Sequence, residues 1–395
     1  MRGIFIFGCM FYFVVGVIHI SIGSLTPYLL DYFNIAANDL SVIIFFQFFG
    51  FVNGVILSPM IVKRYNHLQV ITFGLIVLIL VLSGFFIIKD WYYIGIMMFL
   101  LGYGAGTLET TIGSLIIATH KDNVEKMSKL EVFFGLGAFT FPILVHIFID
   151  IENWFLPFYV LFSLLLVMLV GWSILLSKNQ FEINDMKHQF HIAPDNNKVI
   201  QHFIHHPRKF KFLFLIACFA FLYAGIETNL ANFLPVIMIN LGFENYSLIS
   251  VSVFWSGIVL GRLVIGNLSK KITYSNYLIV SCLLLIVFLN LFPYIAYPLL
   301  QLVNIFLIAF SIAGIFPIVL TLSSIIIGKY VDEVTSIFIA AASFGGAIIS
   351  LLIGWSIENG HTLLIFTIMA AILIWISTKI KYEDTVKVNS TQKLS

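Results

Sequence analysis

The sequence predicts an all-α polytopic membrane protein with twelve transmembrane helices in two parallel-related six-helix halves. Of its 395 residues, 60% are hydrophobic and only 10% are charged, against about 25% charged residues in an ordinary soluble domain. Apolar runs long enough to cross a bilayer follow one another along the chain. These runs are continuous, whereas the strands of a membrane barrel alternate apolar and polar residues. The second half of the sequence also repeats features of the first.

Each apolar run is long enough to cross roughly 30 Å of hydrocarbon at 1.5 Å per helical residue. The expected spans are 4–30, 39–62, 68–88, 91–119, 129–149, 155–176, 212–240, 247–268, 277–294, 298–328, 333–357 and 361–380. The first run shows no small-residue cleavage pattern, so we interpret it as a permanent span rather than a signal peptide. In the tenth span, Gly314 and Pro317 predict a kink.

Basic residues set the expected orientation. Of the 21 lysines and arginines, 20 fall on the side of the two termini, and only Lys89 falls on the other side. Cytoplasmic loops carry an excess of Lys and Arg. We therefore expect a multi-pass protein of the plasma membrane with both termini in the cytoplasm.

One long polar segment divides the chain. The predicted organisation is a first half over 1–176, a cytoplasmic linker over 177–211, a second half over 212–380 and a cytoplasmic tail over 381–395. The linker contains five histidines at irregular spacing, which we interpret as part of a solvated segment rather than as a metal site.

Composition and motifs disfavour several classes of function. The net charge of +2 gives no indication of a nucleic-acid partner. Without a P-loop pattern, ATP is not the expected energy source, and no nucleophile–base pair indicates an enzyme. Cys9, Cys218 and Cys282 lie in apolar runs without a CxxC motif, so no disulfide or metal site is predicted. We expect no cofactor, and a functional monomer in the lipid bilayer.

The two halves resemble each other at an offset of about 208 positions. The matched features are Pro27 with Pro235, His19 with Glu227, Gly54 with Gly261, and Gly137-Ala138 with Gly346-Ala347. Each half has six spans, so both halves start on the same side, and an axis along the membrane normal relates them. Transporters with such repeats bind substrate between the halves, near the membrane midplane.

Acidic residues inside spans are the first candidates for function, because a charge at a helix centre costs roughly 2.5–3.5 kcal/mol on insertion scales. Glu109 lies in the fourth span, on a face with Gly102, Gly106 and Gly113 that suits close packing or a cavity wall. We expect Glu109 to exchange a proton; the alternative is a neutral carboxyl hydrogen-bonded to a neighbouring helix. Glu227 lies in the middle of the seventh span.

Uncharged polar residues form a second group. Asn229 and Asn232 are one turn apart, so both amides can point the same way, and amides suit sugar hydroxyls. Interhelical hydrogen bonding is the alternative. His19 is a candidate for proton relay or for packing. Gln47 and Trp255 are candidate sugar contacts, each with packing as the alternative.

Glu131 is expected to begin the fifth helix, close to Lys129. A helix-start or surface role and a cavity role both remain open for it.

LETT at Leu108–Thr111, in a glycine-rich fourth span, resembles the motif of the fucose permease branch of the major facilitator superfamily. The stretches GVIHISIGSLTPYLL, EKMSKLEVFFGLGA and FLYAGIETNLANFLP are similar to those of the glucose/mannose–proton symporters of Gram-positive bacteria. The resemblance implies that Glu109 carries the coupled proton. Glu131 takes the place of a glutamine in a Q-x-F-x-x-x-G pattern.

Two positions depart from the fucose permease pattern. Phe134 stands where that branch has a sugar-contacting asparagine, and Gly23 stands where it has an aspartate. A different partner must take the role of this aspartate, and His19 and Glu227 are the candidates.

The resemblance implies import of a neutral hexose, glucose or mannose, coupled to protons by alternating access. Glu109, Glu227 and His19 are the expected proton-coupling residues, and Gln47, Glu131, Asn229, Asn232 and Trp255 the expected sugar contacts. The alternatives are a proton antiporter for a drug or another small solute, or a sensor built on the same fold that does not transport.

Overall fold

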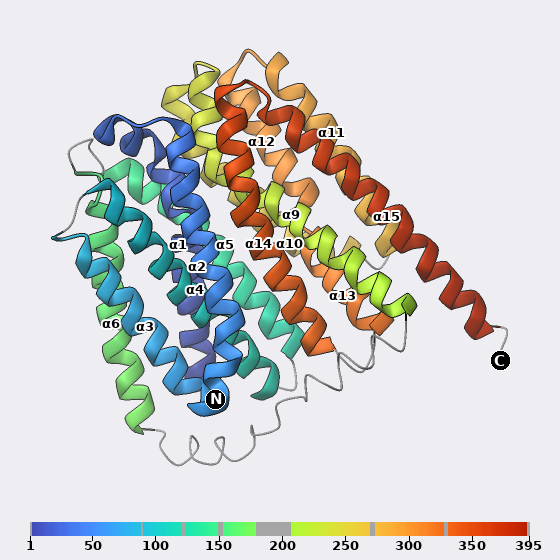
Figure 1. Ribbon diagram of the computed structural model, residues 1–395, viewed down its shortest axis with the longest axis horizontal. Coiled ribbons are helices and arrows are strands. Elements are labelled where there is room, and N and C mark those ends of the chain that lie inside the picture. Colours follow the sequence, from blue (N-terminus) through green and yellow to red (C-terminus); the bar gives the residue numbers. More distant parts are fainter. Residues whose placement is uncertain are drawn as a thin grey trace. The chain divides into compact units, whose positions relative to one another are not determined.

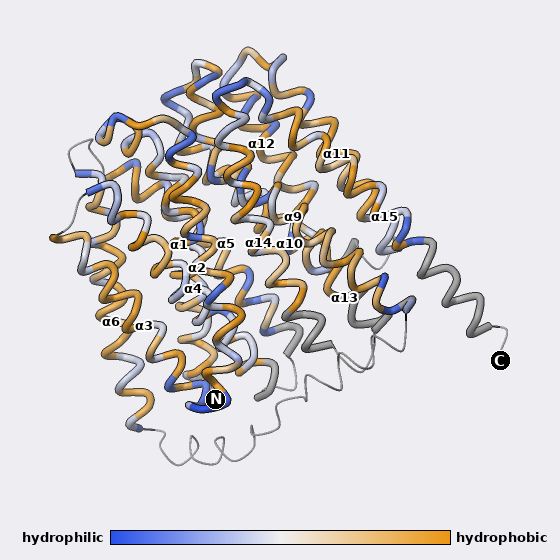
Figure 2. Tube along the Cα trace, viewed as in Figure 1, coloured by the Kyte–Doolittle hydropathy of each residue, from blue (hydrophilic) through white to orange (hydrophobic). Residues whose placement is uncertain are grey.

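The computed structural model describes residues 2–87, 90–119, 123–148, 153–178, 207–268, 273–327 and 331–392 (Figure 1). Its described part contains 12 helices long and apolar enough to cross a membrane. The number matches the prediction. Most bounds agree to within a few residues, but the fifth helix begins earlier, at Asn123, and the last continues to Gln392, into the segment predicted as a tail. Figure 2 shows hydrophobic residues along most of the length of these helices. In a bilayer only helices and closed barrels satisfy every backbone group internally, so the chain is a multi-pass membrane protein.

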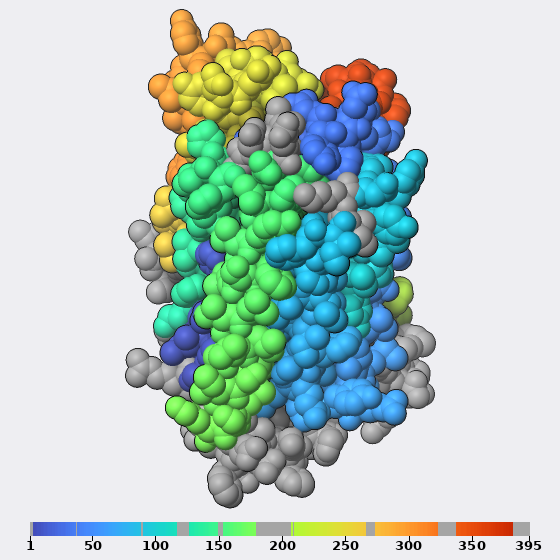
Figure 3. Space-filling model, turned by 90° about the vertical axis from the view of Figure 1, so that its left-hand side faces the viewer, coloured from blue at the N-terminus to red at the C-terminus, as the bar shows by residue number. Residues whose placement is uncertain are grey.

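The chain forms two compact units, the first of residues 1–193 and 231–252 and the second of residues 194–230 and 253–395. Six helices belong wholly to the first unit: α1 (Arg2–Phe33), α2 (Ala37–Arg64), α3 (His67–Gly84), α4 (Trp91–Thr119), α5 (Asn123–Phe148) and α6 (Leu156–Lys178). Here α2 packs on α4, α1 on α5, and α3 on both α4 and α6. Figure 3 shows α3 and α6 side by side on one face.

Two helices contribute to both units, α9 (Pro207–Asn240) and α10 (Ser247–Leu268), with the short 3-10 turn η2 (Glu244–Tyr246) between them in the chain. The remaining elements lie in the second unit: α11 (Tyr274–Leu291), η3 (Phe292–Tyr294), α12 (Pro298–Ile312), α13 (Ile315–Ile327), α14 (Val331–Glu358) and α15 (Thr362–Gln392). There α11 packs on α12, α13 and α15, and α14 packs on α13 and α15.

The tenth span is broken where the sequence predicts a kink. It consists of α12 and α13, with a turn at residues 313–314 between them. Pro317 has no N–H to donate to the carbonyl of Ala313, so a continuous helix would lose this hydrogen bond. The Tyr277 hydroxyl of α11 occupies the space that a side chain at Gly314 would need.

The repeat seen in the sequence recurs in helix packing. A Cβ at Gly137 would overlap the carbonyl oxygen of Phe13 where α5 crosses α1, and a Cβ at Gly345 would overlap that of Phe221 where α14 crosses α9. Gly345 follows Gly137 by 208 positions, and Phe221 follows Phe13 by the same number. The equivalent of Gly137 is therefore Gly345, one position before the Gly346 expected from sequence.

The second and fourth spans repeat in the same way. Gly54 packs against the carbonyl oxygen of Tyr103 in the first unit, and Gly261 packs against that of Phe310 in the second. Both pairs are offset by 207 positions. In each unit, glycines therefore allow the corresponding pairs of helices to come into backbone contact.

Candidate functional site

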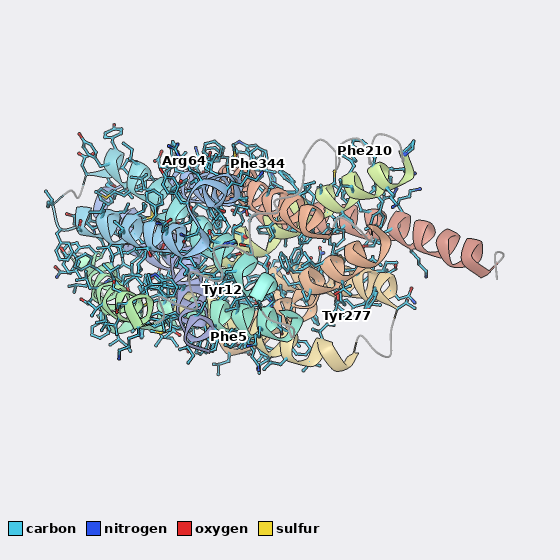
Figure 4. All side chains as sticks on the ribbon, turned by 90° about the horizontal axis from the view of Figure 1, so that it is seen from below. Phe5, Tyr12, Arg64, Phe210, Tyr277 and Phe344 are labelled. Atoms are coloured by element: carbon cyan, nitrogen blue, oxygen red, sulfur yellow. The ribbon has the colours of Figure 1, made fainter. Side chains whose placement is uncertain are left out.

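Glu109 lies in α4, half-buried, with Tyr12 of α1 beside it. The Tyr12 hydroxyl donates to the Glu109 carbonyl at 3.2 Å and interacts electrostatically with the carboxyl groups of both Glu109 and Glu131. Figure 4 labels Tyr12. The structure thus brings two predicted acids into the surroundings of one buried phenol that sequence reasoning missed. Tyr12 offered no signal, because it lies among aromatic residues in an apolar run.

The expected start of the fifth helix is wrong. α5 begins at Asn123, so Glu131 lies in the third turn of this helix instead of at its first residue. Glu131 is half-buried there. A role as a helix-start residue is therefore excluded, and its position next to Tyr12 is compatible with a cavity role.

The glycine face around Glu109 is a packing face at two of its three positions. A Cβ at Gly102 would overlap the Gln47 carbonyl, and one at Gly106 would overlap the Phe51 carbonyl, both on α2. A Cβ at Gly113 would instead face α1, at 3.1 Å from the Tyr12 hydroxyl. The glycines fix how closely α4 approaches α2, and so position Glu109.

His19 lies in an aromatic environment in the first unit. Its ring meets Phe48, Phe51 and Phe134 edge-on, at centroid distances of 4.7, 6.3 and 5.1 Å. Phe134 is the residue that replaces the asparagine of the fucose permease pattern. In this chain that position packs against His19 instead of offering an amide.

Gln47 is 2% exposed, and its side chain donates to the Ile18 carbonyl of α1. Its Oε1 atom has no hydrogen-bond partner in the described part of the chain. A buried acceptor left unsatisfied costs about 1–3 kcal/mol, so this oxygen is a candidate acceptor for a ligand hydroxyl.

Asn232 bridges two backbone groups of α1. Its Oδ1 accepts from the Gly23 N–H at 3.1 Å, and its Nδ2 donates to the His19 carbonyl at 3.5 Å. A Cβ at Gly23 would lie 2.5 Å from Asn232 Cα. The aspartate that the fucose permease branch has at this position therefore has no space here.

Asn229 is fully buried in the second unit, and its Nδ2 donates to the carbonyls of Gly225, at 2.9 Å, and Gly346, at 3.1 Å. Its Oδ1 has no hydrogen-bond partner among the described residues. Asn232 lies one turn further along the same helix, but the two amides reach different partners: Asn229 binds α14 and Asn232 binds α1.

Glu227 forms an ion pair that sequence reasoning missed. Its Oε1 lies 3.6 Å from Nη2 of Arg262 on α10, and both side chains are 11% exposed. One turn earlier on α9, the Tyr223 hydroxyl donates to the Ile312 carbonyl at 3.4 Å and interacts electrostatically with both charged groups. Ile312 is the last residue of α12, so this cluster adjoins the break in the tenth span.

Arg262 enters the sequence argument only as one of the basic residues that set orientation. Its position in an apolar run, directly after Gly261, is the signal that it lies inside the protein. An arginine cannot lose its proton in a protein, so its burial requires a partner with negative charge, and Glu227 supplies it.

Trp255 is 1% exposed and meets Phe254 edge-on at 6.0 Å. This burial is compatible with the packing alternative. Among the described residues no group of three or more His, Cys, Asp or Glu could hold a metal ion. The five histidines of the predicted linker lie outside the described residues.

Known proteins share both the sequence and the fold of this chain. The family model described as Major Facilitator Superfamily matches residues 4–350. The chain is 58% identical over 388 residues to the glucose/mannose transporter GlcP of Bacillus subtilis (strain 168), covering 98% of this chain and 96% of that protein.

Two solved structures have the same fold at low identity. The xylose transporter XylE from E. coli, in a partially occluded inward-open conformation, aligns with a TM-score of 0.76 at 12% identity over 96% of this chain and 97% of that one. The nucleoside transporter NupG aligns with a TM-score of 0.73 at 11% identity over 94% of this chain and 99% of that one. The chain therefore belongs to the major facilitator superfamily.

Proposed function

We propose that the chain is a secondary active transporter of the plasma membrane that imports glucose or mannose together with protons. The observation that carries the proposal is the 58% identity, over 98% of the chain, to a bacterial glucose/mannose transporter. The buried carboxyl of Glu227 and the half-buried one of Glu109 support proton coupling, since ionisable residues inside membrane helices are costly and mark proton and substrate pathways.

For the sugar contacts we propose Gln47 in the first unit and Asn229 in the second. Each has a buried side-chain oxygen without a hydrogen-bond partner among the described residues, while its amide nitrogen is bound to backbone. A hexose hydroxyl can donate to such an oxygen. Glu131, Asn232 and Trp255 remain the other proposed sugar contacts, and the latter two also have structural roles. Asn232 holds the backbone of α1, and Trp255 packs within the helices.

For the protons we propose Glu109 and Glu227, with His19 as a relay. When Glu227 takes up a proton, its attraction to Arg262 is lost, and the arginine must turn to another acceptor. This exchange couples protonation to the helices that carry the pair, α9 and α10, beside the broken tenth span. With 100 mV across the membrane, one proton supplies about 2.3 kcal/mol, enough for roughly fiftyfold accumulation of a neutral solute.

The predicted halves over 1–176 and 212–380 are the proposed bodies that move in alternating access, joined by the linker over 177–211 and followed by the tail over 381–395. Both termini and the linker are proposed to be cytoplasmic, and the functional form is proposed to be a monomer. Motion of two repeats around a central site is the general mechanism of such transporters.

The test is uptake of labelled glucose into vesicles that contain the purified protein, with an imposed pH gradient. The wild-type protein accumulates glucose against its gradient, whereas Glu109→Gln loses accumulation and keeps exchange of internal for external sugar. Glu244→Gln removes an exposed carboxyl of η2 and serves as the control with unchanged uptake.

Accumulation by Glu109→Gln would contradict the role of Glu109 and leave Glu227 as the carrier. No uptake of any hexose by the wild-type protein would remove the sugar assignment, and extrusion of a dye by the same vesicles would favour the drug antiporter.

A further inference from the structure

An apolar groove of about 570 Å³ lies among α9, α14 and α15 in the second unit. Its walls include Phe214, Cys218 and Leu222 of α9, Phe344 of α14, and Ile372 and Trp375 of α15. Figure 1 shows the first turns of α9 beside α15, and Figure 4 labels Phe344 and, at the start of α9, Phe210. None of the proposed sugar or proton residues lines the groove.

The walls of the groove are exposed on the surface of membrane-spanning helices. Phe214 is 61% exposed, Trp375 57% and Phe344 42%, and all three lie in membrane-spanning helices. From Phe214 to Leu222 the groove follows α9 for roughly 12 Å at 1.5 Å per residue. That length fits within one leaflet, which is half of a hydrocarbon layer about 30 Å thick. A lipid acyl chain matches both the chemistry and the length.

Lysines continue the groove face at one end. On α9, Lys211 precedes Phe214 by three residues and Cys218 by seven, and on α15, Lys379 follows Trp375 by four and Ile372 by seven. Residues three, four and seven apart share a face of a helix. α9 and α15 run in opposite directions along the groove. Lys211 precedes the groove residues of α9 and Lys379 follows those of α15, so both lysines lie at the same end of the groove.

The position of Lys379 is also fixed by contact. Its Nζ lies 5.6 Å from the centre of the Trp375 ring, which forms part of the groove wall. A cation over an aromatic face is attracted by the ring, so this ammonium is held at the mouth of the groove. Together with Lys211 it gives the mouth a positive charge, whereas the walls are apolar.

We propose that this groove binds an anionic glycerophospholipid, with one acyl chain in the groove and the phosphate at Lys379 and Lys211. A basic residue near an anionic membrane surface contributes about 1 kcal/mol, which corresponds to about fivefold in affinity. Loss of either lysine therefore weakens binding about fivefold, and loss of both by more than tenfold.

The experiment uses the full chain in phosphatidylcholine vesicles. Phosphatidylglycerol with brominated acyl chains is titrated in, and its bromine atoms quench nearby tryptophan fluorescence. The part of the quenching that is missing in the Trp375→Phe variant is the signal from the groove. The comparison lipid is phosphatidylcholine with the same brominated chains. Half-maximal quenching is expected at a several-fold lower mole fraction of brominated phosphatidylglycerol than of brominated phosphatidylcholine. Lys379→Gln and Lys211→Gln each shift its midpoint about fivefold upward.

The matched control is Lys381→Gln. Lys381 is nine residues beyond Ile372, on the opposite side of α15, where it donates to Asn276 at 2.8 Å. Its removal is expected to leave the midpoint unchanged. Equal quenching by the two lipids, or equal shifts for Lys379→Gln and Lys381→Gln, would overturn the proposal. Ala341→Phe fills the groove without adding a tryptophan and is expected to abolish the difference between the two lipids; if that variant does not fold, the lysine variants decide.

Discussion

The ion pair between Glu227 and Arg262 makes a strong prediction about stability. The two charges lie 3.6 Å apart with 11% of each side chain exposed. At an effective dielectric constant of about 20, their attraction is roughly 4.6 kcal/mol, and removing one member of a buried pair typically costs about 3–5 kcal/mol. Glu227→Gln is therefore expected to lower the free energy of unfolding by about 3–5 kcal/mol.

The two single variants are expected to differ. In Glu227→Gln the arginine keeps its charge without this carboxylate, because it cannot lose its proton. In Arg262→Gln the remaining carboxyl can become neutral by taking up a proton, so its loss is smaller. The double variant removes both charges together and is expected to recover about 2–3 kcal/mol relative to the sum of the two single losses.

The measurement is denaturant unfolding of the four proteins in detergent micelles, followed by tryptophan fluorescence. Lys381→Gln is the control, because it removes an exposed lysine that donates to Asn276; its effect should stay within about 0.5 kcal/mol. A coupling energy near zero would refute the reasoning, since it would mean that the two charges do not stabilise each other.

Two further predictions concern helix contacts. Gly137→Ala places a methyl group on the carbonyl oxygen of Phe13 and is expected to lower the free energy of unfolding by about 1–3 kcal/mol. Gly95→Ala, whose Cβ would have no described neighbour closer than 3.5 Å, is the control and should be neutral in the same denaturant unfolding experiment. Equal losses in the two variants would contradict the packing. Asn232→Ala leaves the Gly23 N–H without its side-chain acceptor and is expected to cost about 1–3 kcal/mol. If this variant and the wild-type protein have the same free energy of unfolding, the hydrogen bonds from Asn232 to α1 do not stabilise the fold.

Much of the fold follows from the sequence, because a membrane helix is set by its own composition. Continuous apolar runs must form helices in a bilayer, so the twelve spans agree with the structure. The polar ends of helices are less predictable, because α5 starts earlier and α15 ends later than their apolar runs. The break at Gly314 and Pro317 was also predictable, since proline removes a backbone donor whatever surrounds it. The repeat was visible through its prolines and glycines.

The contacts of the candidate residues were less predictable, because they depend on which helices meet. The apolar run around Arg262 indicates that it lies inside the protein, but not that its partner is Glu227. Nothing local in the sequence shows that the Tyr12 hydroxyl lies beside Glu109 and Glu131. The two asparagines of α9 show the same limit. Their spacing predicts a shared face of the helix, but it does not predict that Asn229 binds the backbone of α14 and Asn232 that of α1.

The most direct test of proton-coupled sugar import is the external pH of a weakly buffered suspension of vesicles that contain the protein. When glucose or mannose is added without a membrane potential, a coupled importer draws protons inward with the sugar. We predict a transient rise in external pH that is absent with fucose and absent in Glu109→Gln. Entry of labelled glucose without any change in pH would contradict proton coupling.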